Sequence, residues 1–114
     1  MRLVLSALVA LAPLPASGWE CRFAQECRDA DPCAPTDTAL TVETDGMAAR
    51  LVTPSRTIEG RLGVTGGGAS FVVAVAPGGV HLLTIAPPDG TARYTLHRAP
   101  PGRAITRLGT CTAE

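Results

Sequence analysis

The chain has 114 residues and is 46% hydrophobic, with one Trp, one Tyr and two Phe, and its ten basic residues balance its ten acidic ones. That length suits one domain. The balanced charge argues against a dedicated nucleic-acid binder, and the hydrophobic content argues against intrinsic disorder. Every basic residue is Arg, and the absence of Lys excludes Schiff-base chemistry and a phosphate-loop lysine.

Residues 1–18 have the three parts of a secretory signal peptide. Arg2 supplies the positive start, residues 3–14 form an uncharged run, and Ala16-Ser17-Gly18 supplies small residues before a cleavage point at Trp19. The apolar run is shorter than the roughly 20 residues that span a bilayer. We therefore predict a signal-peptide helix at residues 1–18 and one exported domain at residues 19–114. This domain is expected in the periplasm or outside the cell, with no membrane span after cleavage.

The four cysteines, Cys21, Cys27, Cys33 and Cys111, all lie in the expected exported part. A small exported domain meets an oxidising compartment, so two disulfides are predicted. Each of the three possible pairings joins Cys111 to the N-terminal cluster and closes a loop of roughly 80 to 90 residues. The pairing stays open, although a turn at Asp29–Pro32 favours Cys27–Cys33 and therefore Cys21–Cys111. The spacing matches no thioredoxin-type, haem or zinc motif.

The segment after the cysteine cluster predicts a first hairpin. Leu40, Val42, Ala49 and Leu51 alternate with polar residues on either side of Asp45-Gly46. That pair favours a two-residue type I′ turn, in which Leu40 faces Leu51 and Val42 faces Ala49. One face of this hairpin should therefore cover a core.

Further strands follow at intervals of about ten residues. Ile58, Leu62 and Val64 alternate with Glu59 and Arg61, which predicts a third strand. The apolar run Phe71–Ala76 predicts a central strand buried on both faces. Turns at Pro77-Gly78-Gly79 and at Pro87-Pro88-Asp89-Gly90 lead into strands at residues 80–86 and 91–98, and residues 104–111 form the last strand. No segment after residue 39 has a helical stripe. The fold class predicted is all-β: a small antiparallel sandwich or barrel of hairpins, held by disulfides and closed by its first and last strands.

The alternation of residues along the expected hairpin at residues 80–98 predicts which side chains lie on the same face. A loop of either two or four residues puts Leu83 on the same side as Tyr94. His81 then joins the core face, where a structural role is expected. His97 and Arg93 point the opposite way.

Several motifs resemble a family of small exported bacterial proteins. They are Trp19-x-Cys21-x-Phe23-x-x-Glu26-Cys27 near the start, Asp89-Gly90-x-Ala92-Arg93-Tyr94-Thr95-x-His97, and Leu108-Gly109-Thr110-Cys111 at the end. The resemblance covers most of residues 19–114. It implies export and a shared fold, and it carries no activity. A looser likeness, in size and disulfide-bonded β architecture, is to periplasmic lysozyme inhibitors with small barrels.

The sequence contains no recognisable catalytic or metal motif. Ser55 and Ser70 lack a nucleophile elbow, so no catalytic residue, metal or cofactor is predicted. Acidic residues concentrate at residues 19–45 and arginines at residues 46–114, which indicates either internal pairing or a basic surface for an anionic partner. The candidate ligand-binding residues are Arg93, His97 and Arg107.

The sequence therefore predicts an exported binding or envelope-associated module and no enzyme. Its partner would be an unknown envelope protein or an anionic ligand. An inhibitor of the lysozyme-inhibitor type is the alternative. A small hydrolase that uses His81 or His97 is a third interpretation.

Overall fold

In the computed structural model, residues 17–98 and 102–114 are described, and they form an all-β protein. Eight strands follow one another along the chain: β1 (Ser17–Arg28), β2 (Ala34–Asp45), β3 (Ala48–Val52), β4 (Thr57–Val64), β5 (Ser70–Ala76), β6 (Gly79–Ala86), β7 (Thr91–Arg98) and β8 (Ala104–Ala113). Most of the predicted signal peptide, residues 1–16, lies outside the described residues. Ser17 and Gly18 belong to β1, where the Gly18 carbonyl accepts a hydrogen bond from Glu114 N at 3.0 Å.

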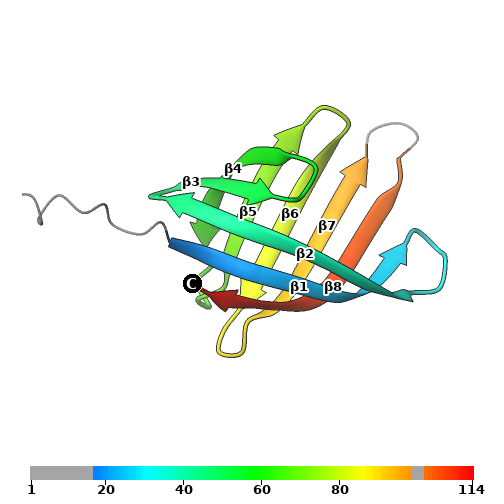
Figure 1. Cartoon of the computed structure of the whole chain (residues 1–114), viewed down its shortest axis with the longest axis horizontal. Coiled ribbons are helices and arrows are strands. Elements are labelled where there is room, and N and C mark those ends of the chain that lie inside the picture. Colours follow the sequence, from blue (N-terminus) through cyan, green and yellow to red (C-terminus); the bar gives the residue numbers. More distant parts are fainter. Residues whose placement is uncertain (1–16, 99–101) are drawn as a thin grey trace, which may run out of the picture.

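The strands form a closed antiparallel barrel in which each strand pairs with the next and β8 pairs with β1 (Figure 1). The first and last strands lie side by side along the barrel wall, at the blue and red ends of the colour scale. The structure thus confirms the all-β prediction and its closure by the terminal strands. Between the two predicted architectures, it is the barrel and not the sandwich.

The core fills the inside of the barrel, because successive side chains of a strand point to opposite faces. Along β6 the even positions face outward, while His81, Leu83 and Ile85 are buried. The buried apolar set is Cys21, Phe23, Leu40, Val42, Ala49, Leu51, Ile58, Val72, Ala74, Leu83, Ile85, Ala92, Tyr94, Ile105 and Cys111. Tyr94 and Phe23 pack as an aromatic pair with centroids 6.0 Å apart.

The prediction that Phe71–Ala76 is buried on both faces is wrong. In β5, Val72 and Ala74 are buried, but Val73 and Val75 are 38% and 73% exposed. A closed barrel is a single layer, so each strand has only one buried face. The continuous apolar run therefore places half of its side chains on the outer surface.

The first hairpin has the predicted faces but a different register. Its turn residues are Gly46 and Met47, so Val42 pairs with Leu51, whereas the prediction paired Val42 with Ala49. Gly46 has φ +63°, which suits the first central position of a type II′ turn. A type I′ turn at Asp45-Gly46 would require positive φ at both residues. The shift is two residues, so the inward face is unchanged.

In the hairpin of β6 and β7, the side chains face the sides that were predicted. Its loop has four residues, Pro87 to Gly90, and Leu83 pairs directly with Tyr94. His81 is 2% exposed and faces the interior, as expected from the alternation. Arg93 and His97 face outward on the same strand that carries Tyr94.

Two disulfides join the cysteines in the favoured pairing, Cys21 with Cys111 and Cys27 with Cys33. Cys21 and Cys111 are direct cross-strand partners inside the barrel, so their bond links β1 to β8. The Cys27–Cys33 bond closes the turn between β1 and β2, where Asp31 N donates to Arg28 O at 2.8 Å. Two such bonds fit an oxidising compartment.

Candidate functional site

One end of the barrel opens into a cavity of about 610 Å³, which we call the barrel mouth. The loop between β3 and β4 forms one side of it, and the neighbouring parts of β2, β4, β6, β7 and β8 form the rest. Its main polar side chains are Thr38, Arg56, His81, Tyr94, Arg98 and Arg107. Its apolar wall includes Ala39, Pro54, Ile58 and Leu96. The mouth therefore combines three guanidinium groups with an apolar surface.

A directed hydrogen-bond chain crosses the mouth from Arg56 to Tyr94. Arg56 Nη2 lies 3.2 Å from His81 Nε2. A guanidinium has no acceptor, so Arg56 must donate and Nε2 must accept. This assigns the imidazole proton to Nδ1, which donates to the Tyr94 hydroxyl oxygen. The donor-only chemistry of Arg56 thus sets the direction of the whole chain.

The surroundings of His81 favour its neutral form. Burial lowers the pKa of this imidazole, and the nearby positive charges of Arg56 and Arg98 lower it further. A neutral ring is also what the hydrogen bond from Arg56 requires. The lowered pKa therefore favours the neutral imidazole, and the hydrogen bond from Arg56 determines its tautomer.

Two hydroxyl groups in the mouth have donor capacity to spare. Burial raises the pKa of Tyr94, so its hydroxyl keeps its proton at neutral pH. Because that oxygen accepts from His81, its own hydrogen points elsewhere, and no acceptor for it is found among residues 17–98 and 102–114. The Thr38 hydroxyl, which also lines the mouth, is buried and has no hydrogen-bond partner among the described residues. Both groups suit an acceptor that enters the mouth.

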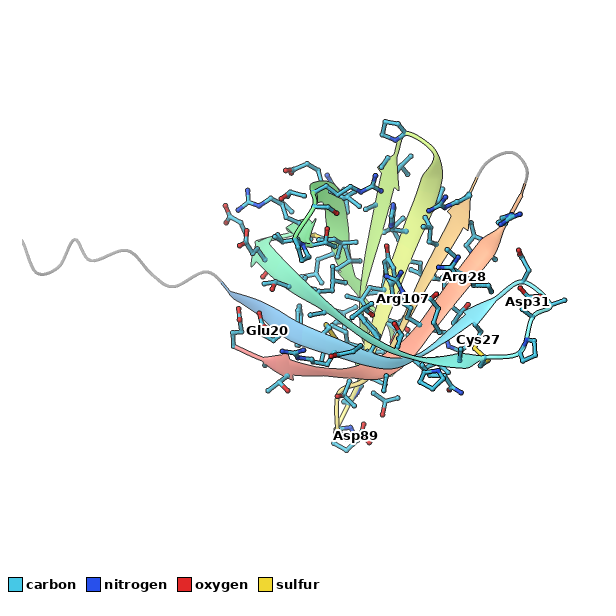
Figure 2. The ribbon with its side chains drawn as sticks, turned by 45° about the vertical axis from the view of Figure 1, so that its right-hand side comes forward. Glu20, Cys27, Arg28, Asp31, Asp89 and Arg107 are labelled. Atoms are coloured by element: carbon cyan, nitrogen blue, oxygen red, sulfur yellow. A yellow bond between two sulfur atoms is a disulfide. The ribbon has the colours of Figure 1, made fainter. Side chains whose placement is uncertain are left out.

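Arg107 is held over the mouth from two sides. Its Nε donates to Glu26 Oε1 at 2.7 Å, and its guanidinium carbon lies 5.8 Å from the centre of the Tyr94 ring. Arg28 Nε donates to the other carboxylate oxygen of Glu26 at 2.7 Å. The hydrogen bond from Arg107, followed by that from Arg28, lowers the pKa of Glu26. Figure 2 shows Arg28 and Arg107 close together toward this end of the barrel.

A β-bulge in β1 makes this contact possible. The pairing of β1 with β8 shifts between Phe23 and Gln25, which pair with the consecutive residues Gly109 and Leu108, so Ala24 is the extra residue relative to β8. Phe23 faces the interior before the bulge, and Glu26 pairs with Arg107 after it. Regular alternation would turn Glu26 to the outer surface. The bulge thus delivers one carboxylate to the inward side of the sheet.

The charge of the mouth remains positive after its ion pairs are counted. Glu26 is shared by two arginines, so it neutralises only one of them. Arg56 and Arg98 have no carboxylate within 4 Å in the described part of the chain. Asp37 also borders the mouth, but its side chain is 90% exposed and is paired at 3.6 Å with Arg22. Positive charge and donors thus converge on one space.

The structure does not bring the three predicted ligand-binding residues together. Arg107 faces inward, opposite Tyr94, and belongs to the mouth. Arg93 and His97 lie on the outer face of β7, both exposed, opposite Leu108 and Ala104. Of the other mouth residues, His81 was considered from the sequence only as a structural or a hydrolase residue, and none was predicted to bind a ligand. Strand alternation was the available signal for Arg98, which shares the inward face of Tyr94.

A second hollow, of about 340 Å³, lies at the other end of the barrel beside the loop between β6 and β7. Trp19 and Pro87 contribute to its wall. Its carboxylate, Asp89, already accepts hydrogen bonds from Thr91 N and Oγ1, at 3.2 and 2.9 Å. Those bonds lower the pKa of Asp89. The residues that line this hollow in the described part of the chain include no Arg or His.

Across the described ranges, no three His, Cys, Asp or Glu side chains are placed to hold a metal ion. In the same residues, no helix has the length and hydrophobicity needed to cross a membrane. Comparison of the chain with protein-family models, with curated proteins and with solved structures returned no match. The resemblance to small exported bacterial proteins stays a prediction from the motifs.

Proposed function

We propose that the chain is an exported binding module that takes a small ligand bearing an oxyanion, such as a carboxylate, sulfate or phosphate group, in the barrel mouth. The observation that carries this proposal is the spare donor capacity of Tyr94 and Thr38 beside unpaired guanidinium groups. Buried donors without acceptors are unfavourable unless a partner supplies the missing bonds. An oxyanion has several acceptor lone pairs and the opposite charge, so it meets both needs.

The mouth suits a small molecule by its size and walls. A cavity of about 610 Å³ is within the usual range for small-ligand sites. The barrel interior beyond it is filled by side chains such as Leu51, Leu83 and Phe23. A ligand would therefore sit at the open end, with its charged group among the donors and an apolar part against Ile58 and Leu96.

Export is part of the same proposal. It is supported by the two disulfides and by the signal-peptide pattern of residues 1–18. A barrel joined by a core disulfide between its first and last strands is a rigid scaffold. Such a scaffold keeps binding groups in position and lowers the entropy lost on binding.

The test is an NMR titration of the oxidised protein with benzoate, and with benzamide as its uncharged counterpart of similar shape. Ionic strength is held constant, because surface electrostatics depend on salt. Benzoate should shift the signals of Thr38, His81 and Tyr94, and benzamide should not. Failure of both benzoate and sulfate to shift these signals would overturn the proposal, as would equal shifts with benzamide.

A matched pair of variants tests whether an inward or an outward arginine of β7 contributes to benzoate binding. Arg98→Gln removes an inward guanidinium of β7, and Arg93→Gln removes an outward one from the same strand. Loss of one charge-assisted bond should weaken benzoate binding about tenfold in Arg98→Gln. Arg93→Gln should leave it unchanged. Equal weakening in both would point to diffuse attraction by net charge.

Inhibition of a cell-wall lytic enzyme is the alternative function, and it is tested with the same preparation. Lysozyme activity is measured with and without the barrel protein. Inhibition combined with no anion binding would favour the inhibitor interpretation. Binding of benzoate with no effect on lysozyme supports the ligand module.

A further inference from the structure

We infer that the barrel mouth takes up one proton together with its oxyanion, and that His81 is the group that receives it. This inference rests on the proposed function and describes how the same site is regulated. It predicts that the affinity of the mouth for an oxyanion rises as the pH falls.

Arg56 can donate to His81 only while the facing nitrogen of the ring is unprotonated. Its Nη2 donates to His81 Nε2 at 3.2 Å only while that nitrogen has a free lone pair. A proton on Nε2 would set two donors against each other, so Arg56 would have to turn away. Arg56 lies in the loop between β3 and β4 at the edge of the mouth, where a bound oxyanion offers it another acceptor.

The other ring nitrogen of His81 keeps its hydrogen bond with Tyr94 in both protonation states. His81 Nδ1 donates to the Tyr94 oxygen in both the neutral and the protonated imidazole. The Tyr94 hydrogen therefore continues to point away from His81 after protonation. The proton changes the contact with Arg56 and adds charge, while the Tyr94 donor stays in place.

The charged groups that share the mouth with His81 are mostly positive. Arg56, Arg98 and Arg107 are the cations of the mouth, and Asp37 is the acidic residue of its wall. The flanking partners on β5 and β7 are Ala74 and Leu96, which carry no charge. Glu26 is held by Arg107 and Arg28. An oxyanion would thus bring negative charge to His81, which is faced by arginines and whose direct strand partners are uncharged.

The sign of the effect follows from linkage. In the empty mouth, burial and the two arginines keep the pKa of His81 low. A bound oxyanion offsets the arginine charges, so the pKa of His81 rises in the complex. Between the two pKa values each anion binds with up to one proton. Affinity then increases up to about tenfold for each unit of pH decrease.

The experiment is calorimetric titration with sulfate, whose charge is constant between about pH 5 and 8. Repeating it in buffers of different ionisation enthalpy measures the number of protons taken up. The wild-type protein should take up a fraction of a proton that changes with pH, and its affinity should rise toward acid pH.

The chain has two histidines, and a variant of each shows which one takes up the proton when sulfate binds. His81→Gln removes the inner imidazole and should abolish proton uptake while sulfate still binds. His97→Gln removes the outward one and should behave as the wild type. If His81→Gln does not fold, NMR titration of the His81 ring in the wild type gives its pKa with and without sulfate.

The outcomes distinguish this inference from the proposed function. Sulfate binding with no proton uptake, or an unchanged His81 pKa in its presence, would overturn the inference and leave the binding module standing. Proton uptake that persists in His81→Gln would also overturn it. Absence of any binding by sulfate and benzoate would overturn the proposed function itself.

Discussion

Glu26 of β1 lies directly opposite Arg107 of β8, and its carboxylate accepts a hydrogen bond from Arg107 Nε at 2.7 Å. The contact spans 81 positions of sequence and connects the two strands that close the barrel. It also holds Arg107 beside the Tyr94 ring. One ion pair thus links the closure of the barrel to the shape of its mouth.

Glu26→Gln should destabilise the protein by about 1 kcal/mol at neutral pH, because both arginines lose a charged acceptor. Hydrogen bonds from Arg107 and Arg28 lower the pKa of Glu26 in the folded state. Its contribution is therefore present above the unfolded pKa and is lost as the pH falls through the folded one. Urea unfolding at neutral and acid pH measures this, and the cost of the variant should shrink in acid.

Glu43→Gln is the matched control. Glu43 pairs with Arg50 at 3.1 Å on the outer surface, with side chains 42% and 53% exposed. Such a pair contributes less than about 0.5 kcal/mol. An equal loss of stability in both variants would show that Glu26 acts as an ordinary surface charge.

The parts of the fold that depend on alternation and turn residues could be predicted from the sequence. The inward orientation of Leu83 and Tyr94 followed from strand alternation, and the two disulfides followed from an even number of cysteines in a chain that was expected to be exported. Both depend on local patterns that repeat every two residues or on covalent chemistry. Choosing a barrel over a sandwich needs the curvature of the whole sheet, which no local pattern records.

The site was harder to predict because its residues meet through long-range geometry. The bulge at Ala24 has no sequence signature, yet it decides that Glu26 faces Arg107. Arg56 belongs to a loop, where alternation predicts no direction. His81 was correctly placed on the core face, but its contact with Arg56 requires the three-dimensional closure of the barrel.

The two disulfides should differ in their contribution to stability. The Cys21–Cys111 bond closes a sequence separation of 90 residues and the Cys27–Cys33 bond one of 6. The chain-entropy model assigns about 4.6 kcal/mol to the first and about 2.3 kcal/mol to the second. Unfolding of the Cys21→Ala/Cys111→Ala and Cys27→Ala/Cys33→Ala double variants in urea compares them. A larger loss in the second variant would contradict this ranking.

Tyr94 is the only tyrosine of the chain, so tyrosinate absorbance reports on it alone. Burial raises its pKa above the usual value near 10. The hydroxyl should therefore ionise at higher pH in the folded protein than in urea. Its neutral form contributes stability that is present below the unfolded pKa and is lost as the pH rises through the folded one. Identical titration curves in the two states would refute the assigned burial.

Tyr94→Phe should weaken sulfate binding about fivefold, which is the effect of losing one hydrogen bond of about 1 kcal/mol. The variant keeps the aromatic ring that packs on Phe23. His81 Nδ1 loses its acceptor, however, so the free energy of unfolding should also fall by about 1 to 3 kcal/mol. Thr95→Val removes a hydroxyl from the outer face of the same strand and serves as the control. Equal affinities in Tyr94→Phe and the wild type would remove Tyr94 from the binding site.

Ala substitutions at two loop glycines distinguish the cost of an unfavourable backbone conformation from the cost of a steric clash. Gly46 and Gly90 both have positive φ, at +63° and +79°. A Cβ on Gly46 would meet nothing within 4 Å, so Gly46→Ala should cost about 1 kcal/mol from conformation alone. A Cβ on Gly90 would lie 2.1 Å from the carbonyl oxygen of Cys111.

That carbonyl cannot easily move away. Cys111 N donates to Gly90 O at 2.8 Å, and the Cys111 side chain is bonded to Cys21 in the core. Gly90→Ala should therefore cost more than about 3 kcal/mol, well above Gly46→Ala. Urea unfolding of the two variants under oxidising conditions compares them. A similar loss of stability in the two variants would mean that β8 can move near Cys111. In that case the core disulfide would not fix the loop between β6 and β7 against the last strand.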